Sequence, residues 1–100
     1  MYLQAQQKLK SSQSSFFFVF SSLHFAIIGE VKHNKKQAVS EAAVDKFVDS
    51  IGVVKRDAKK QKAICIFISN TGFAKKAIPI LERYKVIYGT LEEVIEKLSL

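Results

Sequence analysis

The sequence predicts a single α/β domain in which helices flank a mixed central sheet. Apolar runs typical of strands alternate along the chain with segments of helical periodicity, which is the pattern of an α/β fold. Of the 100 residues, 48% are apolar, so the chain can bury one core and is too short for two. With one proline and four glycines, it does not have the composition of a disordered or low-complexity sequence.

The N-terminal part contains two predicted strands. Residues 1–15 are polar and rich in glutamine and serine, so we expect a polar tail there and a single domain over residues 16–100. The apolar runs at 16–20 and 23–32 are typical of strands. The two serines between them favour a hairpin.

A helix is predicted over residues 38–51. Its apolar side chains recur at i, i+3, i+4 and i+7, which places them on one face; they are Val44, Phe47, Val48 and Ile51. Gly52 stands where a glycine commonly ends a helix. We therefore expect residues 53–62, which contain five basic groups and one acid, to form a basic connector.

The next strand and helix follow from two different patterns. The continuous apolar run at 62–69 is typical of a strand that is buried on both faces of a sheet. Residues 73–84 then show helical spacing. Pro79 lies inside this segment, where it either kinks the helix or occupies its first turn.

A short strand at 85–88, ended by Gly89, precedes the last helix. Thr90 and Glu93 have the spacing of a capping box, and apolar residues at helical spacing follow them. The predicted order of elements is therefore β-β-α-β-α-β-α.

The net charge and the single cysteine indicate which partners and which cellular location to expect. The formal net charge of +7 favours polyanionic partners, either nucleic acid or an anionic membrane face. No stretch of 18 apolar residues is present, so we expect no membrane-spanning helix and no membrane partner. Cys65 is the only cysteine, which excludes an internal disulfide and fits a reducing, cytoplasmic location. Because it lies inside an apolar strand, we expect a buried, inert thiol.

Glu30 and Lys32 are the residues with the clearest chemical potential. They are two positions apart on a predicted strand, so both side chains point to the same face. A carboxylate there can ligate a hard cation such as Mg²⁺, and an ammonium group can stabilise the charge that develops on a phosphate. The competing interpretation is an ordinary pair of neighbours on one face of a strand.

Three segments of the chain form a pattern of their own: GEVKHNKK, the amphipathic helix VSEAAVDKFVDSIG and the run KAICIFISNTGFAKKAI. Together they resemble the PD-(D/E)XK nuclease superfamily. The similarity covers residues 23–98 and is greatest to the Mrr-like and archaeal ATPase-associated branches. It implies a restriction-endonuclease-like fold and a DNA-associated, nuclease-like function.

The resemblance also implies roles for individual residues. Glu30 would ligate Mg²⁺ or Mn²⁺ together with the carbonyl group of Val31, and Lys32 would be the catalytic lysine. Lys35 and Lys36 would contact DNA phosphates. Lys55 and Arg56, from the second basic run, are added as nucleic-acid-binding candidates, and the two runs form one phosphate-tracking surface if they share a face.

One feature of the superfamily is missing from this chain. In the superfamily an aspartate lies on the strand before the E-x-K motif, which Glu30, Val31 and Lys32 match in this chain. Residues 1–29 contain no acidic residue. The domain is then a degenerate, non-cleaving relative; or a fragment whose native N-terminal part, with the aspartate and a fused ATPase, is missing or replaced by residues 1–22; or a domain whose carboxylate has moved to the helix. The candidates for that moved carboxylate are Glu41, Asp45 and Asp49.

We therefore expect a DNA-associated nuclease-like domain that is truncated or catalytically impaired. If the site is active, the reaction is Mg²⁺-dependent hydrolysis of a phosphodiester. The alternative is a non-catalytic interaction or dimerisation module in which strand 16–20 is a sheet edge that pairs with a partner or a second copy. A third interpretation is a regulatory domain that works with an ATPase partner domain.

Overall fold

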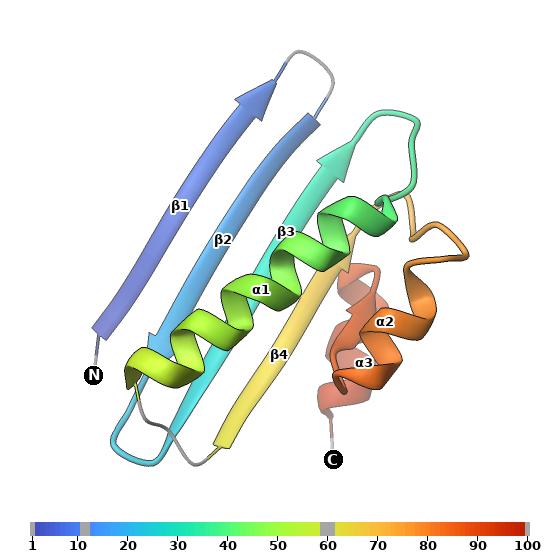
Figure 1. Ribbon diagram of the computed structural model, residues 1–100. Helices are drawn as coiled ribbons and strands as arrows, with labels where there is room; N and C mark the ends of the chain where they lie inside the picture. The colour runs from blue at the N-terminus through green and yellow to red at the C-terminus, as the bar shows by residue number, and fades with distance from the viewer. Residues whose placement is uncertain (1, 11–12, 59–61, 100) are drawn as a thin grey trace.

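The computed structural model describes residues 2–10, 13–58 and 62–99 (Figure 1). This part of the chain contains five strands and three helices. The strands are β1 (Tyr2–Lys10), β2 (Gln13–Ser21), β3 (Phe25–Asn34), β4 (Lys62–Ser69) and β5 (Ile87–Gly89). The helices are α1 (Glu41–Ala58), α2 (Ile78–Arg83) and α3 (Leu91–Leu98).

The strands form one mixed sheet in the order β1-β2-β3-β4-β5. β1, β2 and β3 are antiparallel to one another, whereas β4 is parallel to β3 and β5 is parallel to β4. α1 and α2 lie on one face of the sheet, and α3 lies behind it, against β4 and β5 (Figure 1). This arrangement confirms the predicted mixed α/β class, and from β2 onward the order of elements is the predicted one.

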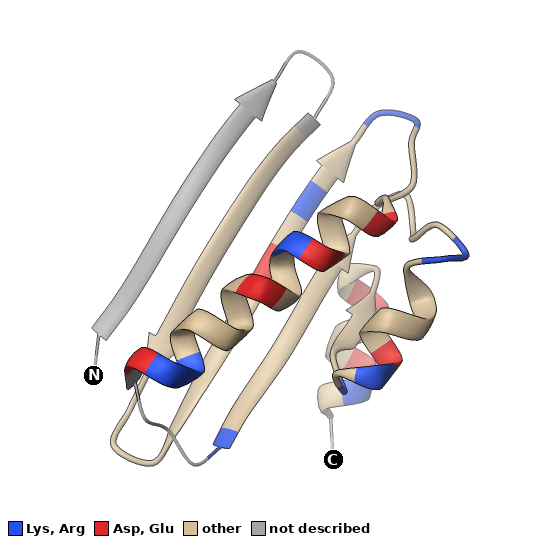
Figure 2. Ribbon diagram, viewed as in Figure 1, with Lys and Arg blue, Asp and Glu red and all other residues tan. Residues whose placement is uncertain are grey.

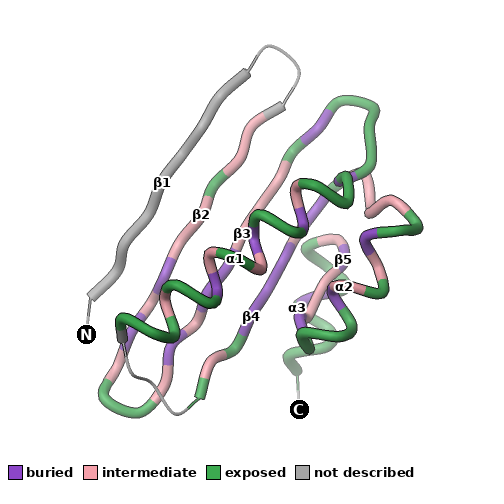
Figure 3. The backbone as a smooth tube through the Cα atoms, viewed as in Figure 1, coloured by how far each residue is buried: buried purple, intermediate pink, exposed green. Residues whose placement is uncertain are grey.

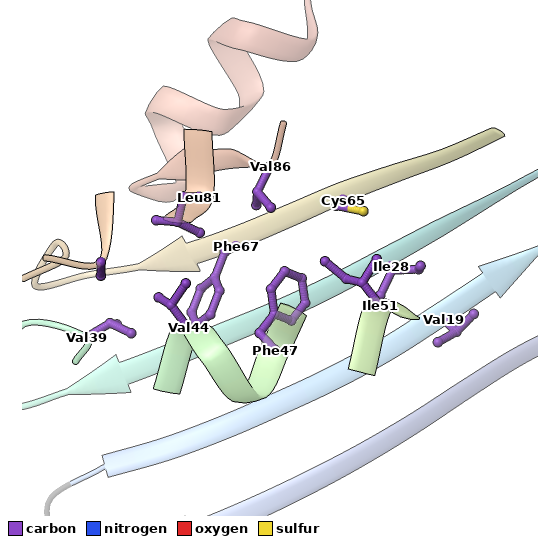
Figure 4. Packing of buried hydrophobic residues seen from close by; sticks show 11 residues of the cluster. Val19, Ile28, Val39, Val44, Phe47, Ile51, Cys65, Phe67, Leu81 and Val86 are labelled. Carbon is purple, nitrogen blue, oxygen red and sulfur yellow. The ribbon is translucent and has the colours of Figure 1, made fainter. Parts of the chain in front are cut away.

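The core lies between α1 and the sheet face that α1 covers, called the α1 face below. Successive side chains of a strand point to opposite faces, so β2 contributes Val19, β3 contributes Ile28 and β4 contributes Phe67 to this layer. Phe47 of α1 packs edge to face on Phe67, with 4.9 Å between the ring centroids (Figure 4). Val44 of α1 is buried in the same cluster, which confirms the apolar helix face that the periodicity predicts.

The polar tail expected at residues 1–15 is wrong, because β1 occupies residues 2–10 and β2 begins at residue 13. β1 pairs with β2 along nine residues, from Tyr2 opposite Ser21 to Lys10 opposite Gln13. This strand gains its stability from backbone pairing with a neighbour, which a weakly periodic sequence does not reveal. The run 16–20 is consequently not a sheet edge, since β2 is paired on both sides.

The predicted end of the first helix at Gly52 is also wrong. α1 continues through this glycine to Ala58, so much of the expected basic connector is helical. Gly52 is exposed and has no atom near the position of a Cβ, so here it makes no demand on the backbone. Val54, beyond the glycine, packs against the core, and burial of that side chain favours a longer helix.

The remaining elements agree more closely with the sequence. Pro79 lies in the first turn of α2, which is the second of the two predicted alternatives. The Thr90 hydroxyl accepts a hydrogen bond from the Glu93 amide at 3.2 Å, and the Glu93 carboxylate accepts one from the Thr90 amide at 2.9 Å. This is the predicted capping box of α3. Within the described ranges, no helix is long and apolar enough to cross a membrane.

Candidate functional site

Glu30 and Lys32 lie on the α1 face, near the carboxyl end of β3, and both are half-buried. The strand alternation therefore places them on one face, as predicted. Each lies between a residue of β2 and a residue of β4. These cross-strand neighbours are Phe17 and Phe67 for Glu30, and Ser15 and Ser69 for Lys32.

Ser15 is the residue of the preceding strand that meets Glu30. It stands directly opposite Lys32 in the register of β2 and β3, and its hydroxyl donates a hydrogen bond to the Glu30 carboxylate. This is a position on the strand before E-x-K from which a side chain reaches the glutamate. A serine therefore stands where an aspartate would give a second carboxylate.

The helix carboxylates do not replace the missing acid. Glu41, Asp45 and Asp49 are all exposed on α1, whose apolar face is the one turned to the sheet. No group of three His, Cys, Asp or Glu side chains that could hold a metal ion occurs in the part of the chain that the structure describes. The acidic residues of α1 thus do not form a ligand cluster with Glu30 there.

The oxygen atoms beside Glu30 are a poor donor set for a divalent cation. They are one carboxylate, the hydroxyl of Ser15 and the backbone carbonyl of Val31, which lies inside the sheet between Phe16 and Ile68. Mg²⁺ in proteins usually depends on carboxylates, together with waters or substrate phosphates. The residues present do not fit a tightly held Mg²⁺ or Mn²⁺.

Two loops meet at the carboxyl ends of β3 and β4, because parallel strands end at the same edge of a sheet. The Val39 amide donates to the Gly72 carbonyl at 2.9 Å, and the Ala74 amide donates to the Val39 carbonyl at 2.8 Å. The Asn70 side chain accepts from the Asn34 amide at 2.9 Å and donates to the Asn34 carbonyl at 2.8 Å. These bonds tie the two loops into one unit.

This pair of loops has a one-sided charge. Residues 32–40 and 70–77 contain five lysines and no acidic residue, and we call this set the lysine edge: Lys32, Lys35, Lys36, Lys75 and Lys76. All of them except Lys32 are exposed. Figure 2 shows the basic segments of both loops at the same end of the sheet. The predicted contacts Lys35 and Lys36 thus belong to a larger basic surface.

Lys55 and Arg56 lie elsewhere. α1 starts beside the carboxyl end of β3 and runs back across the sheet, so its last turn, which contains both residues, lies at the opposite end (Figures 1 and 2). The four predicted nucleic-acid-binding residues therefore do not form one surface. The sequence prediction ended this helix at Gly52 and treated Lys55 and Arg56 as part of a connector. In the structure both residues lie near the end of an 18-residue helix that runs back across the sheet.

Sequence reasoning missed Ser15, Lys75 and Lys76. The rule that parallel strands end at one edge would have placed the Lys75–Lys76 pair at the same end of the sheet as Lys35, since both strands were predicted. No comparable signal pointed to Ser15, because its role depends on the register between β2 and β3.

Cys65 is not part of this site. It is buried on β4, and burial raises the pKa of its thiol above the ordinary value of 9.0, while the positive charge of Lys55 opposes that shift. A thiol held in its protonated form is a weak nucleophile. The prediction of a buried thiol is confirmed.

No protein-family model matches the chain, and neither does any curated protein or solved structure. The resemblance to PD-(D/E)XK domains therefore stays a prediction from the motif residues. The structure adds the mixed sheet, the hydrogen bond from Ser15 to Glu30, and the lysine edge.

Proposed function

We propose that this domain binds the phosphate backbone of DNA at the lysine edge and does not cleave it. The observation that carries the proposal is the position of the lysine edge, at the end of the strand that contains Glu30 and Lys32. The group of β2 that contacts Glu30 is the hydroxyl of Ser15 and not a second carboxylate. The result is a basic surface with an incomplete metal site beside it.

The charge distribution supports backbone binding. Each lysine that neutralises a phosphate releases condensed counterions, so binding gains free energy without reading the base sequence. Because the two loops are hydrogen-bonded to each other, little loop ordering opposes the association. The lysine edge is also free of acidic residues, which would repel the phosphates.

The Ser15–Glu30 pair accounts for the expected absence of cleavage. The Ser15 hydroxyl is neutral and already donates to the one carboxylate at this point. A single carboxylate binds a divalent cation weakly, and hydrolysis at a metal site needs the ion to be held and oriented. Lys32 is then left to contact a phosphate without a reaction following.

The test is fluorescence anisotropy with a short labelled DNA duplex at one salt concentration. We expect the variant with Lys35→Ala, Lys36→Ala, Lys75→Ala and Lys76→Ala to lose at least tenfold in affinity. Lys55→Ala with Arg56→Ala, which removes two charges at the other end of the sheet, is the control and should change affinity less than threefold. Equal losses of binding free energy per charge removed in the two variants would show that binding follows net charge and not this edge.

Cleavage is tested on the same DNA with Mn²⁺ present. We expect the wild-type chain and Lys32→Ala both to leave the strand intact, with circular dichroism confirming that each is folded. Cutting by the wild type that disappears in Lys32→Ala would mean an active nuclease and would overturn the non-cleaving part of the proposal.

A further inference from the structure

The face of the sheet opposite α1 is apolar over β2 and β3. Among the described elements only α3 lies on this side, and it packs on β5 and β4 (Figure 1). The side chains left beside it are partly exposed (Figure 3), and the largest exposed fractions are 39% for Ile64 and 37% for Phe16. We call this set the bare face: Phe16, Phe18, Phe20, Ile27, Val31 and Ile64.

α3 presents a second apolar surface next to the bare face. Val94 is its buried residue, whereas Leu91, Ile95 and Leu98 are 53%, 54% and 44% exposed and follow one another at i, i+4 and i+7. On the other side of Val94, the Lys97 ammonium donates to the carbonyl of Tyr88 on the edge strand β5. The exposed apolar stripe of α3 therefore lies on the side toward β3, beside the bare face.

The chain exposes more surface than a compact monomer of its mass. It exposes 7074 Å², against about 5,700 Å² on the usual scaling for 11.3 kDa. This excess belongs to the chain as a whole, and the partly exposed side chains of the sheet face opposite α1 and the exposed residues of α3 contribute to it. Apolar patches larger than a few hundred square ångströms commonly mark interaction sites.

We propose that the bare face binds an amphipathic helix of a partner protein, which lies beside α3 and has basic residues along the flank next to α3. Parallel strands such as β3 and β4 are normally covered by helices on both faces. On the face opposite α1, α3 packs on β4 and β5 and leaves β3 uncovered by the described helices. From Phe25 to Val31, β3 offers a length of about 20 Å, which matches a helix of about 13 residues.

Glu92 and Glu96 are the reason to expect basic residues on the partner helix. On the helical wheel of α3 they follow the stripe of Leu91, Ile95 and Leu98 on the side away from the sheet. A helix lying against that stripe brings its flank next to both carboxylates, so lysine or arginine there gains favourable pairs. A second copy of this chain, stacked face to face, would instead press these two carboxylates onto apolar side chains.

The test uses two synthetic peptides of about 14 residues with the same leucine pattern, one with lysine and one with glutamate on the flanks. Each is labelled and titrated with the full chain. We expect the lysine peptide to bind at least tenfold more tightly, although net charge alone would make this basic chain prefer the glutamate peptide. Glu92→Lys with Glu96→Lys should reverse the preference.

Two further variants locate the binding surface. Ile95→Lys changes an exposed residue of the stripe and should weaken lysine-peptide binding at least tenfold, while Val53→Lys makes the same kind of change on exposed α1 and should not. Circular dichroism confirms that both are folded. A preference for the glutamate peptide, or equal effects of the two variants, would overturn the proposal. So would self-association of the chain that Ile95→Lys abolishes, since a second copy would then cover this face.

Discussion

Ser15 on β2 and Glu30 on β3 are joined by a hydrogen bond from the serine hydroxyl to the carboxylate, across the two central antiparallel strands. The bond places a neutral group at the position from which, on our proposal, a second carboxylate would act. A site of this composition can hold a phosphate next to Lys32 but offers little to a divalent cation.

We predict that Ser15→Asp creates a metal response that the wild type lacks. Two adjacent carboxylates repel each other, so without metal the variant should lose about 1.4 kcal/mol of unfolding free energy, equivalent to one pKa unit. Mn²⁺ at ten times its dissociation constant should restore about 1.4 kcal/mol. Thermal unfolding with and without Mn²⁺ measures both effects.

Ser15→Asn is the control for that experiment, since it adds a side chain of the same size without charge and should show no response to Mn²⁺. If the wild type is stabilised by Mn²⁺ as strongly as Ser15→Asp, Glu30 already belongs to a working metal site and our interpretation of Ser15 is incorrect.

We predict that Phe47→Ala costs about 3–5 kcal/mol of unfolding free energy, which is the usual loss for a buried aromatic residue. The Phe47 ring packs edge to face on Phe67 at 4.9 Å and on Phe17 at 6.3 Å between centroids, so its removal opens a cavity between α1 and the sheet. Urea denaturation measures the change. Leu23→Ala, at a position 88% exposed, should stay within about 0.5 kcal/mol of wild type.

Cys65 should make stability depend on alkaline pH. Its thiol has a pKa raised by burial, so its contribution is complete below the ordinary value of 9.0 and is lost as pH rises toward the folded-state pKa. Unfolding free energies of wild type and Cys65→Ala should therefore converge above about pH 9. Both proteins contain Tyr88, so any effect of its ionisation cancels when one unfolding free energy is subtracted from the other. A constant difference across this range would contradict a buried, protonated thiol.

We predict that Thr90→Ala lowers the unfolding free energy by about 1 kcal/mol, because the alanine removes the side-chain acceptor of the capping box of α3. Thr90→Ser keeps the acceptor and should lose much less. Chemical denaturation of the two variants gives the comparison. If both lose the same free energy, the hydroxyl bond to the Glu93 amide contributes nothing and the cap does not stabilise α3.

The parts of the fold that depend on local periodicity could be predicted from the sequence. The spacing of Val44, Phe47 and Ile51 identified the buried face of α1, and the two-residue spacing of Glu30 and Lys32 put them on one face of β3. The Thr90 capping box is similarly local. In each case the signal lies within a few residues of chain.

The parts that failed depend on contacts distant in sequence. β1 forms against a strand whose register no local pattern reveals, and α1 passes Gly52 because side chains beyond it reach the core. That extension moves Lys55 to the end of the sheet opposite Lys35, whereas Lys75 lies at the same end as the predicted site because β3 and β4 are parallel. The candidate site was therefore half predicted: its strand was identified, and its neighbours were not.

The salt dependence of DNA binding tests the central claim most directly. With five lysines on phosphates, the logarithm of the association constant should fall against the logarithm of salt concentration with a slope of about −4.5. In the variant with Lys35→Ala, Lys36→Ala, Lys75→Ala and Lys76→Ala the slope should fall to about −0.9, and in Lys55→Ala with Arg56→Ala it should stay near the wild-type value. A slope unchanged in the first variant would contradict a DNA-binding lysine edge.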